Sequence, residues 1–261
     1  MHLALRERAE AESGVSGAMN PAEFAHRASG GRWICAPHLE LLNRSLMDVA
    51  SGVIKRLMIC MPPRHGKSEF TSKYFPAWYL GTFPDRRIIL TSYEAEFAKE
   101  WGRKVRDILQ EHGQSYFGVS VRPDTSAANR WNLTGRAGGM VTSGVGGPIT
   151  GKGADLLIID DPVKNAEEAD SETYRNRAWE WYTSTAYTRL EPGGALILIQ
   201  TRWHEDDLAG RILEAMEGGG EQWHVLSLPA LSETGEVFAE MIIPAVDAAR
   251  RGLREGDVIR P

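Results

Sequence analysis

The stretch Arg56–Ser68, RLMICMPPRHGKS, decides the fold of this 261-residue chain. It begins with a short apolar run that is typical of a buried β-strand. The residues after that run match the end of the phosphate-loop pattern G-x-x-x-x-G-K-[ST], with Met61 in the place of the first glycine. Gly66 lets the backbone approach a phosphate, Lys67 can reach the β- and γ-phosphates, and the Ser68 hydroxyl can hold Mg²⁺. The stretch therefore predicts a strand, a phosphate loop and a helix that bind a nucleoside triphosphate.

The rest of the chain alternates near-continuous apolar strands with helical patterns. Further strands are expected at 86–93, 155–161, 195–201 and 223–228, with short strands and turns between 118 and 144. Helices are expected at 21–50, 67–80, 94–112, 166–190 and 205–216, and Pro76 is expected to kink or end the second of them. This alternation predicts an α/β fold with a mainly parallel central sheet flanked by helices.

The composition is that of an ordinary globular protein. Hydrophobic residues make up 42% of the chain, charged residues make up 25%, and the formal net charge is −5. Two cysteines, Cys35 and Cys60, are too few for a zinc cluster, and Cys60 is expected to be a small buried hydrophobe. Since no apolar run approaches the length of a membrane span and the N-terminus has no secretory pattern, we expect no membrane partner and a cytosolic location.

A second element, Leu156–Asp161, places two acids at the end of an apolar strand. In a phosphate-loop enzyme such a strand brings a carboxylate next to the Mg²⁺ ion and another next to the attacking water. We assign Asp160 to the metal and Asp161 to orienting or deprotonating the water. The alternative is an acidic turn that Pro162 ends, and the presence of Lys67 and Ser68 upstream disfavours it.

A third stretch, Gln200–His204, follows another buried strand. Ligands lie at the carboxyl ends of the strands in a parallel sheet, so Gln200 and Thr201 are expected to sense the γ-phosphate. The alternative is that Thr201 and His204 cap a helix beginning near Glu205. Arg202 fits either role.

These segments together resemble the large terminase subunit of tailed bacteriophages and prophages. The resemblance rests on Pro62–Ser68, on Thr150–Asp155 leading into Ile159–Pro162, and on Thr201–Leu208, in that family's order and over roughly residues 33–230. It implies an ATPase of the additional-strand, catalytic-glutamate class that uses ATP and Mg²⁺ to move double-stranded DNA into a procapsid. It also implies the portal and the small terminase subunit as partners, a homo-oligomeric ring that is monomeric in isolation, and work in the host bacterial cytoplasm.

The chain departs from the family pattern at two places. Its second acid is Asp161 where a glutamate is usual, and it stops at Pro261 without the strands of a two-metal nuclease. We therefore expect the motor domain alone. The expected organisation is a helical segment at 1–50 that contributes to the adenine side, an ATPase core at 51–230, and a linker or tail at 231–261.

The resemblance adds candidates for several roles. Lys152 lies where related terminases often carry an arginine, so it is a candidate finger that acts on a neighbouring subunit, and Arg64 is a second candidate acting in its own subunit. Trp33 and His38 lie where such motors hold the base, although Trp33 is slightly better explained as a core residue. The residues assigned to the nucleotide are then Trp33, His38, Pro63, Arg64, His65, Gly66, Lys67, Ser68, Glu69 and Gln200.

Two other functions remain open on these residues. One is a helicase or translocase with a similar core, which would need a second motor domain. The other is an assembly subunit in which ATP acts as a switch with negligible turnover, and the acids Asp160 and Asp161 argue against it. The basic residues Arg103, Lys104 and Arg106 alternate with acids along one helix, so a solvated face is a better explanation for them than a DNA contact.

Overall fold

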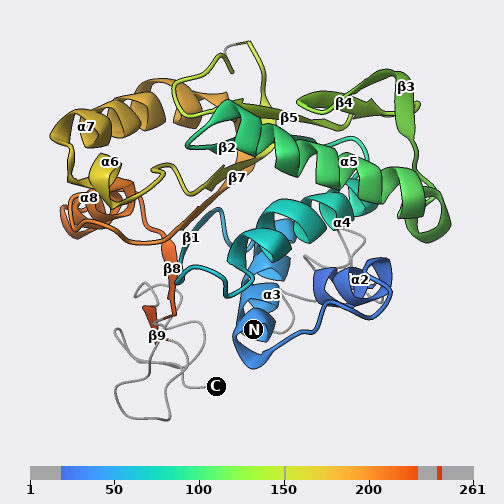
Figure 1. Cartoon of the computed structure of the whole chain (residues 1–261), viewed down its shortest axis with the longest axis horizontal. Coiled ribbons are helices and arrows are strands. Elements are labelled where there is room, and N and C mark those ends of the chain that lie inside the picture. The colour runs from blue at the N-terminus through green and yellow to red at the C-terminus, as the bar shows by residue number, and fades with distance from the viewer. Residues whose placement is uncertain (1–18, 150, 229–239, 243–261) are drawn as a thin grey trace.

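The computed structural model describes residues 19–149, 151–228 and 240–242, and in this part of the chain nine strands form one sheet (Figure 1). The order across the sheet is β3-β4-β5-β2-β6-β7-β1-β8-β9. From β5 to β8 neighbouring strands run parallel, whereas β3, β4 and β9 are added antiparallel at the two edges. The bounds are β1 Arg56–Cys60, β2 Arg87–Ser92, β3 Val121–Ala127, β4 Arg130–Leu133, β5 Gly139–Gly144, β6 Ala154–Asp160, β7 Leu190–Gln200, β8 His224–Ser227 and β9 Glu240–Ile242. The predicted α/β fold with a mainly parallel sheet is confirmed.

Strand β7 lies between β6 and β1, and this is the additional strand of the predicted class. The registers Cys60↔Gln200 and Asp160↔Ile199 bring the ends of these three strands level. The carboxyl ends of β1, β6 and β7 therefore lie next to one another, and ligands bind at the carboxyl ends of the strands in folds of this kind.

Helices cover both faces of the sheet (Figure 1). Their bounds are α2 Pro21–Ala28, α3 Pro37–Ala50, α4 Phe75–Thr82, α5 Ala95–Phe117, α6 Ala166–Asp170, α7 Glu172–Trp181 and α8 Leu208–Glu217. Shorter helical turns are η1 Glu69–Tyr74, η2 Tyr182–Ala186 and η3 Tyr187–Arg189. Within the described residues, no helix is both long and apolar enough to cross a membrane.

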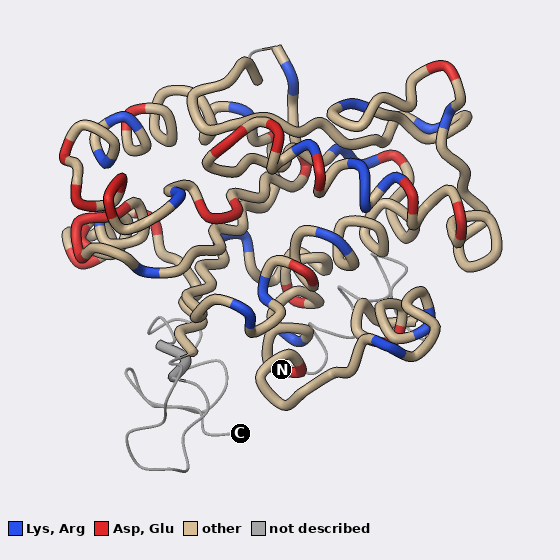
Figure 2. The backbone as a smooth tube through the Cα atoms, in the orientation of Figure 1, with Lys and Arg blue, Asp and Glu red and all other residues tan. Residues whose placement is uncertain are grey.

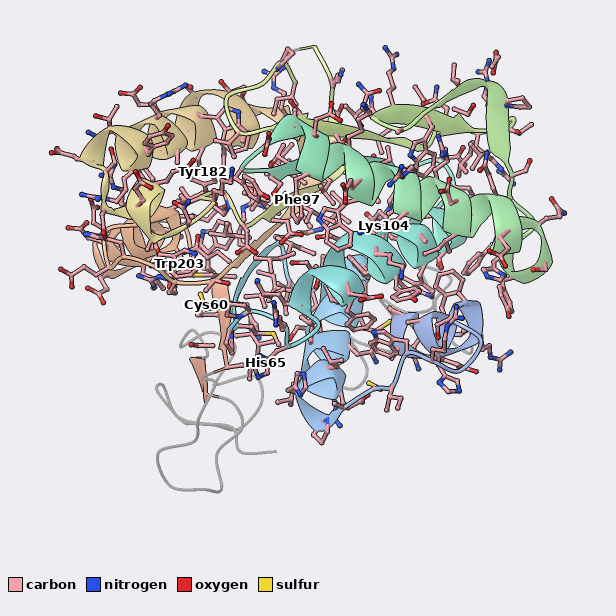
Figure 3. All side chains as sticks on the ribbon, viewed as in Figure 1. Cys60, His65, Phe97, Lys104, Tyr182 and Trp203 are labelled. Carbon is pink, nitrogen blue, oxygen red and sulfur yellow. The ribbon has the colours of Figure 1, made fainter. Side chains whose placement is uncertain are left out.

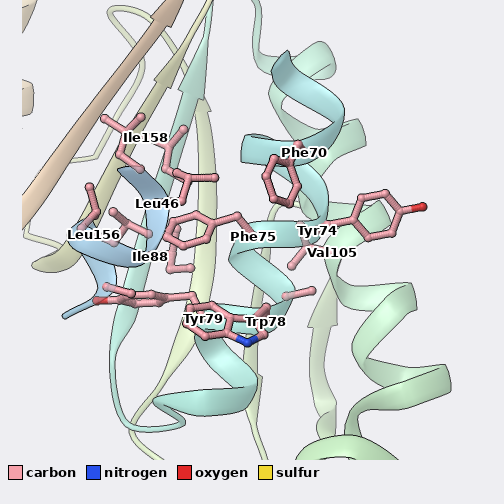
Figure 4. Packing of buried hydrophobic residues seen from close by; sticks show 14 of the residues in the cluster. Leu46, Phe70, Tyr74, Phe75, Trp78, Tyr79, Ile88, Val105, Leu156 and Ile158 are labelled. Carbon is pink, nitrogen blue, oxygen red and sulfur yellow. The ribbon is translucent and has the colours of Figure 1, made fainter. Parts of the chain in front are cut away.

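Alternate residues of the strands face two separate cores. Leu57 and Ile59 of β1 pack with α2 to α5, whereas Met58 and Cys60 pack with the helical turns and α8 on the other face. Figure 4 shows aromatic residues of η1 and α4, including Phe75, against Ile158 and its neighbours on the sheet. Cys60 is buried, as predicted.

The predicted helix 21–50 is wrong, because the structure has two helices there. Helix α2 ends at Ala28, and the backbone then passes through two left-handed glycines, Gly30 (φ 64°) and Gly31 (φ 83°). Glycine tolerates this conformation and commonly terminates helices. Pro37 then begins α3 at a position where its missing N–H costs nothing.

The helix that follows the phosphate loop does not end at Pro76. It contains the wide π-helical turn η1, in which the N–H of Phe75 bonds the carbonyl of Phe70, and it continues as α4 to Thr82. A proline ring clashes with the carbonyl four residues earlier in a regular α-helix, here that of Ser72. The wide turn is the local distortion that lets the helix run past Pro76.

Other helix limits also differ from the predictions. The helix expected at 94–112 extends to Phe117, where the left-handed Gly118 (φ 68°) ends it. The helix expected at 166–190 is divided into α6, α7 and two short turns. Between α6 and α7, Ser171 takes an extended conformation, which no periodicity of apolar residues signals.

The ion pairs expected along α5 are present, although Arg106 is only partly exposed and also donates to the Ser126 carbonyl of β3. Lys99 bonds Glu96 at 3.1 Å, Lys104 lies 4.0 Å from Glu100, and Arg106 bonds Asp107 at 2.7 Å. Figure 2 shows the resulting mixture of basic and acidic residues along this helix, and Figure 3 places Lys104 on it.

Gly102 of α5 packs directly against β4 and the turn before it, and Gly102→Ala is expected to destabilise the fold. The indole N–H of Trp131 donates to the Gly102 carbonyl at 3.0 Å, and an added Cβ would lie 2.4 Å from the Ala128 carbonyl oxygen. Overpacking of this kind costs about 1–3 kcal/mol. Thermal or denaturant unfolding measures the loss. In the control Gly218→Ala the nearest atom is 3.5 Å away, so a change within about 0.5 kcal/mol is expected, and an equal loss in both variants would contradict the packing argument.

Candidate active site

The phosphate loop joins β1 to the helix that begins at Lys67. Two of its residues are left-handed, Arg64 (φ 64°) and Gly66 (φ 82°). A Cβ on Gly66 would meet only the Leu39 side chain at 3.4 Å, so the backbone conformation, more than lack of space, explains the glycine. Left-handed turns of this kind and the N–H groups of the following helix turn both favour an anion.

The Lys67 ammonium lies at the meeting point of three strand ends. It is 6% exposed, and its Nζ donates to Asp161 Oδ2 at 2.9 Å and to Thr201 Oγ1 at 3.1 Å. The other oxygen of Asp161 accepts the backbone N–H of Thr201 at 2.8 Å. The sequence predicts that Lys67 and Thr201 meet the γ-phosphate and that Asp161 orients the attacking water, and the structure brings all three residues together.

Asp161 takes an unusual backbone conformation for this contact. Its φ of 44° is left-handed, which aspartate tolerates better than most residues. Backbone bonds fix it on both sides: its N–H donates to Ile199 and its carbonyl accepts from Tyr93. This turn directs the Asp161 carboxylate to Lys67, while Asp160 points elsewhere.

Asp160 is fully buried at the end of β6, and both of its carboxylate oxygens accept hydrogen bonds. Ser68 donates to Oδ1 at 2.8 Å and Ser72 donates to Oδ2 at 2.7 Å. Burial, followed by the neighbouring Asp161 charge, raises the pKa of Asp160 to about 7, whereas the two hydroxyls and Lys67 lower it. A cation at this carboxylate would favour its ionised form.

The donor set around Asp160 fits Mg²⁺. The ion prefers hard oxygen ligands and is commonly held by one or two carboxylates together with substrate phosphates. Ser68 and Asp160 supply a hydroxyl and a carboxylate within hydrogen-bond distance of each other. No cluster of three or more His, Cys, Asp or Glu side chains suited to a metal occurs in the described ranges, so a second, all-protein metal cage has no support there.

The end of β7 contributes Gln200 and Thr201, and the next residues turn away from the site. Gln200 is 3% exposed, and its carbonyl accepts the N–H of Met61. Arg202 donates to Asp207 at 2.8 Å, which places it at the start of α8 and away from Lys67.

The alternative that Thr201 and His204 cap a helix near Glu205 is wrong. The cap of α8 is Asp207, whose side chain accepts the Gly210 N–H. Trp203 is 45% exposed and lies close to α8 in Figure 3.

A cavity of about 490 Å³ adjoins the other side of the phosphate loop. The residues assigned from sequence to the base and the loop that line it are Trp33, His38, Arg64, His65, Gly66 and Glu69. His38 is bonded to the His65 carbonyl at 3.0 Å, and Figure 3 shows His65 beside α3. Trp33 is only 8% exposed and packs 4.8 Å from the Phe70 ring, so it is mainly a core residue with one edge at the cavity.

Lys152 lies near the amino ends of the parallel strands, whereas the site described above lies at their carboxyl ends. It precedes Ala154, the first residue of β6, whereas Asp160 is the last. At about 3.3 Å per residue the two ends are about 20 Å apart. Lys152 lines a separate cavity of about 200 Å³ with Arg87 and Arg130. Partial burial, followed by the Arg130 charge, lowers the pKa of Lys152. Lys152 is thus not brought together with the other candidates of its own subunit.

Sequence reasoning missed two features of the site. Ser72 was not singled out, although it follows Ser68 by four residues and so lies on the same side of the helix. Lys73 and Tyr74, which line the 490 Å³ cavity, were also missed because their role depends on the packing of η1 against residues 29–39.

Comparisons with known proteins identify one matching family and several similar structures. The family described as "Terminase large subunit, T4likevirus-type, N-terminal" matches residues 58–247. The crystal structure of the HK97 bacteriophage large terminase is similar with a TM-score of 0.55 and 15% identity, and covers 82% of this chain and 44% of its own. The large terminase of a thermophilic bacteriophage aligns with a TM-score of 0.46 and 13% identity, over 83% of this chain and 53% of its own. A search of curated proteins finds no match.

The present chain thus spans less than half of the HK97 protein, and at 15% identity that likeness shows the fold alone. The family match is independent of it and extends over well more than half of this chain, including β6 and β7. On that match, the chain belongs to the terminase large subunit family and corresponds to its N-terminal part.

Proposed function

We propose that this chain hydrolyses ATP and that the hydrolysis powers the movement of viral double-stranded DNA into a procapsid. The observation that carries the proposal is that the Lys67 ammonium donates to both Asp161 and Thr201, at 2.9 and 3.1 Å. Ser68, the residue after Lys67, donates to Asp160, the residue before Asp161. Family membership supports packaging as the setting.

Each residue has a role that follows from its position. Lys67 would bind the β- and γ-phosphates, and the hydroxyl of Ser68 with the carboxylate of Asp160 would hold Mg²⁺, which neutralises charge on the transferring phosphate. In the present arrangement Lys67 is paired with Asp161 at 2.9 Å. Phosphates compete with Asp161 for Lys67, and this exchange would free the carboxylate to orient the attacking water.

The cavity of about 490 Å³ beside the phosphate loop supports the proposal that the chain binds the purine base of ATP. Its walls combine the aromatic residues Trp33 and Tyr74 with charged groups such as Arg64 and Glu69. Concave sites with apolar walls and a few polar groups are typical of nucleotide binding. Arg64, exposed at the loop, is the candidate for stabilising charge within its own subunit.

Charge on the transferring phosphate would also be stabilised by Lys152 of a neighbouring copy. Lys152 precedes β6, whose two ends are about 20 Å apart, so the proposal assigns it to the site of a neighbouring copy and not to its own. Lys152 and Arg130 are two positive side chains that line the same cavity. Their repulsion would be relieved by an anion, and we propose that the phosphate of a neighbouring copy supplies it. The proposal therefore includes a homo-oligomeric ring on the portal of the procapsid, with the small terminase subunit as a further partner and the host bacterial cytoplasm as the location.

Mixing Lys152→Ala with Lys67→Ala subunits is expected to restore part of the turnover that each variant lacks alone. A mixed ring contains composite sites with an intact Lys67 on one copy and an intact Lys152 on the next, and a trans residue acts on its neighbour's transition state. Phosphate release is measured across mixing ratios, and Lys99→Ala, which removes a solvated lysine of α5, is the control. No recovery in a preparation shown to co-assemble would shift the role to Arg64 or Arg202.

The same assay separates the alternatives. A motor releases phosphate faster in the presence of DNA and procapsid, whereas an assembly subunit that uses ATP as a switch binds it with negligible turnover. A helicase-like translocase would be stimulated by DNA alone, without any dependence on the procapsid.

A further inference from the structure

The buried carboxylate of Asp160 is held by two hydroxyls from one helix, and only one of them has a role so far. Ser68, assigned to Mg²⁺, donates to Oδ1 at 2.8 Å. Ser72, one turn further on, donates to Oδ2 at 2.7 Å. Asp160 and Ser72 are both completely buried, so water does not replace the bond between them.

The two bonds have a geometric consequence for the carboxylate. The torsion that rotates an aspartate carboxylate has broad minima, so a single hydrogen bond leaves its plane free to turn. A donor on each oxygen fixes that plane. With Ser72 on Oδ2, the oxygen Oδ1 stays beside the Ser68 hydroxyl, whose own oxygen keeps its lone pairs for a cation.

The contact is not the usual one for a helical serine. Serine side chains inside helices commonly bond the carbonyl four residues earlier. Ser72 instead donates across to the end of β6, 88 residues away in sequence. The preceding residue, Thr71, is equally buried, but its hydroxyl has no partner among the described residues.

We propose that Ser72 is a positioning residue for Mg²⁺: its hydrogen bond to Oδ2 holds the Asp160 carboxylate in the orientation that binds the ion together with Ser68. The inference rests on the proposed function, since it assumes that this carboxylate serves the metal of a bound nucleotide. It adds a residue that touches neither the nucleotide nor the ion. Loss of this kind of supporting bond typically lowers metal affinity about 10–100-fold.

The test measures binding of a fluorescent ATP analogue in EDTA and along a Mg²⁺ series. Ser72→Ala is expected to raise, about tenfold or more, the Mg²⁺ concentration at which half of the Mg²⁺-dependent increase in nucleotide affinity is reached. Affinity in EDTA is expected to stay unchanged, because Lys67 and the phosphate loop are intact. Ser72→Thr, which keeps the hydroxyl, is expected to restore the wild-type Mg²⁺ dependence. Thr71→Val is the matched control, since it removes a neighbouring buried hydroxyl that has no partner among the described residues.

Three results would overturn the inference. One is an unchanged Mg²⁺ dependence in a folded Ser72→Ala variant, another is an equal shift in Thr71→Val, and the third is a loss of affinity that is as large in EDTA as in Mg²⁺. Thermal melting checks the fold, and Ser72→Cys, which keeps the volume but is a weak donor, replaces Ser72→Ala should that variant unfold. If the wild-type chain itself shows no Mg²⁺-dependent nucleotide binding, the proposed function fails instead.

Discussion

Lys67→Ala is expected to abolish ATP hydrolysis while the fold persists. The variant removes the ammonium that would bind the β- and γ-phosphates, and the loss of even one neutral preorganised hydrogen-bond donor costs about 10²–10³ in kcat. It also breaks the 2.9 Å pair with Asp161 and the bond to Thr201, so the geometry of both other catalytic candidates is disturbed. We therefore expect a loss at or above the upper end of that range, measured as phosphate release under saturating ATP.

The control for Lys67→Ala is Lys99→Ala, a solvated lysine whose partner is Glu96. Its turnover and melting temperature are expected to match the wild type. The core around β1 does not depend on the Lys67 ammonium, so circular dichroism of Lys67→Ala is expected to retain the native spectrum. Unchanged turnover in Lys67→Ala would remove the phosphate-loop assignment.

Asp161→Asn is expected to bind ATP and Mg²⁺ and to lose nearly all turnover. Asparagine keeps the oxygen that accepts the Thr201 N–H, and it tolerates the left-handed backbone at φ 44°. What it removes is the negative charge that would orient or deprotonate water, and general-base catalysis of this kind contributes about 10²–10⁴ in rate. Nucleotide affinity and single-turnover phosphate release distinguish a defect in chemistry from a defect in binding.

Asp160→Asn is the companion variant, because Asp160 lies against Ser68 and Ser72. It is expected to weaken Mg²⁺-dependent binding, which Asp161→Asn leaves intact. If Asp161→Asn fails to bind the metal and retains normal residual chemistry, the two aspartates have exchanged roles, or Glu167 or Glu168 is the base.

Much of the fold could be predicted because its signals are local. Strands β1 and β6 and the second half of β7, from Ala195 to Gln200, are largely apolar runs, and a strand buried on both faces of a parallel sheet has this pattern. Helix limits were predicted less well. The break at Gly30 and Gly31, the π turn before Pro76 and the division at Ser171 depend on single backbone conformations, which leave the hydrophobic period nearly unchanged.

The sequence by itself determined the chemistry available to this protein: a phosphate loop at Arg56–Ser68, a pair of acids after β6, and polar residues after β7, all in strand-to-loop positions that share one edge of a parallel sheet. Only the tertiary structure decided how these groups pair. Strand β7 lies between β6 and β1, so Thr201 and Asp161 both reach Lys67, while Ser72 reaches Asp160 and Lys152 is carried to the far edge. These contacts join residues dozens of positions apart. Their distances follow from strand order and register, which packing of the whole core sets and no short stretch of sequence contains.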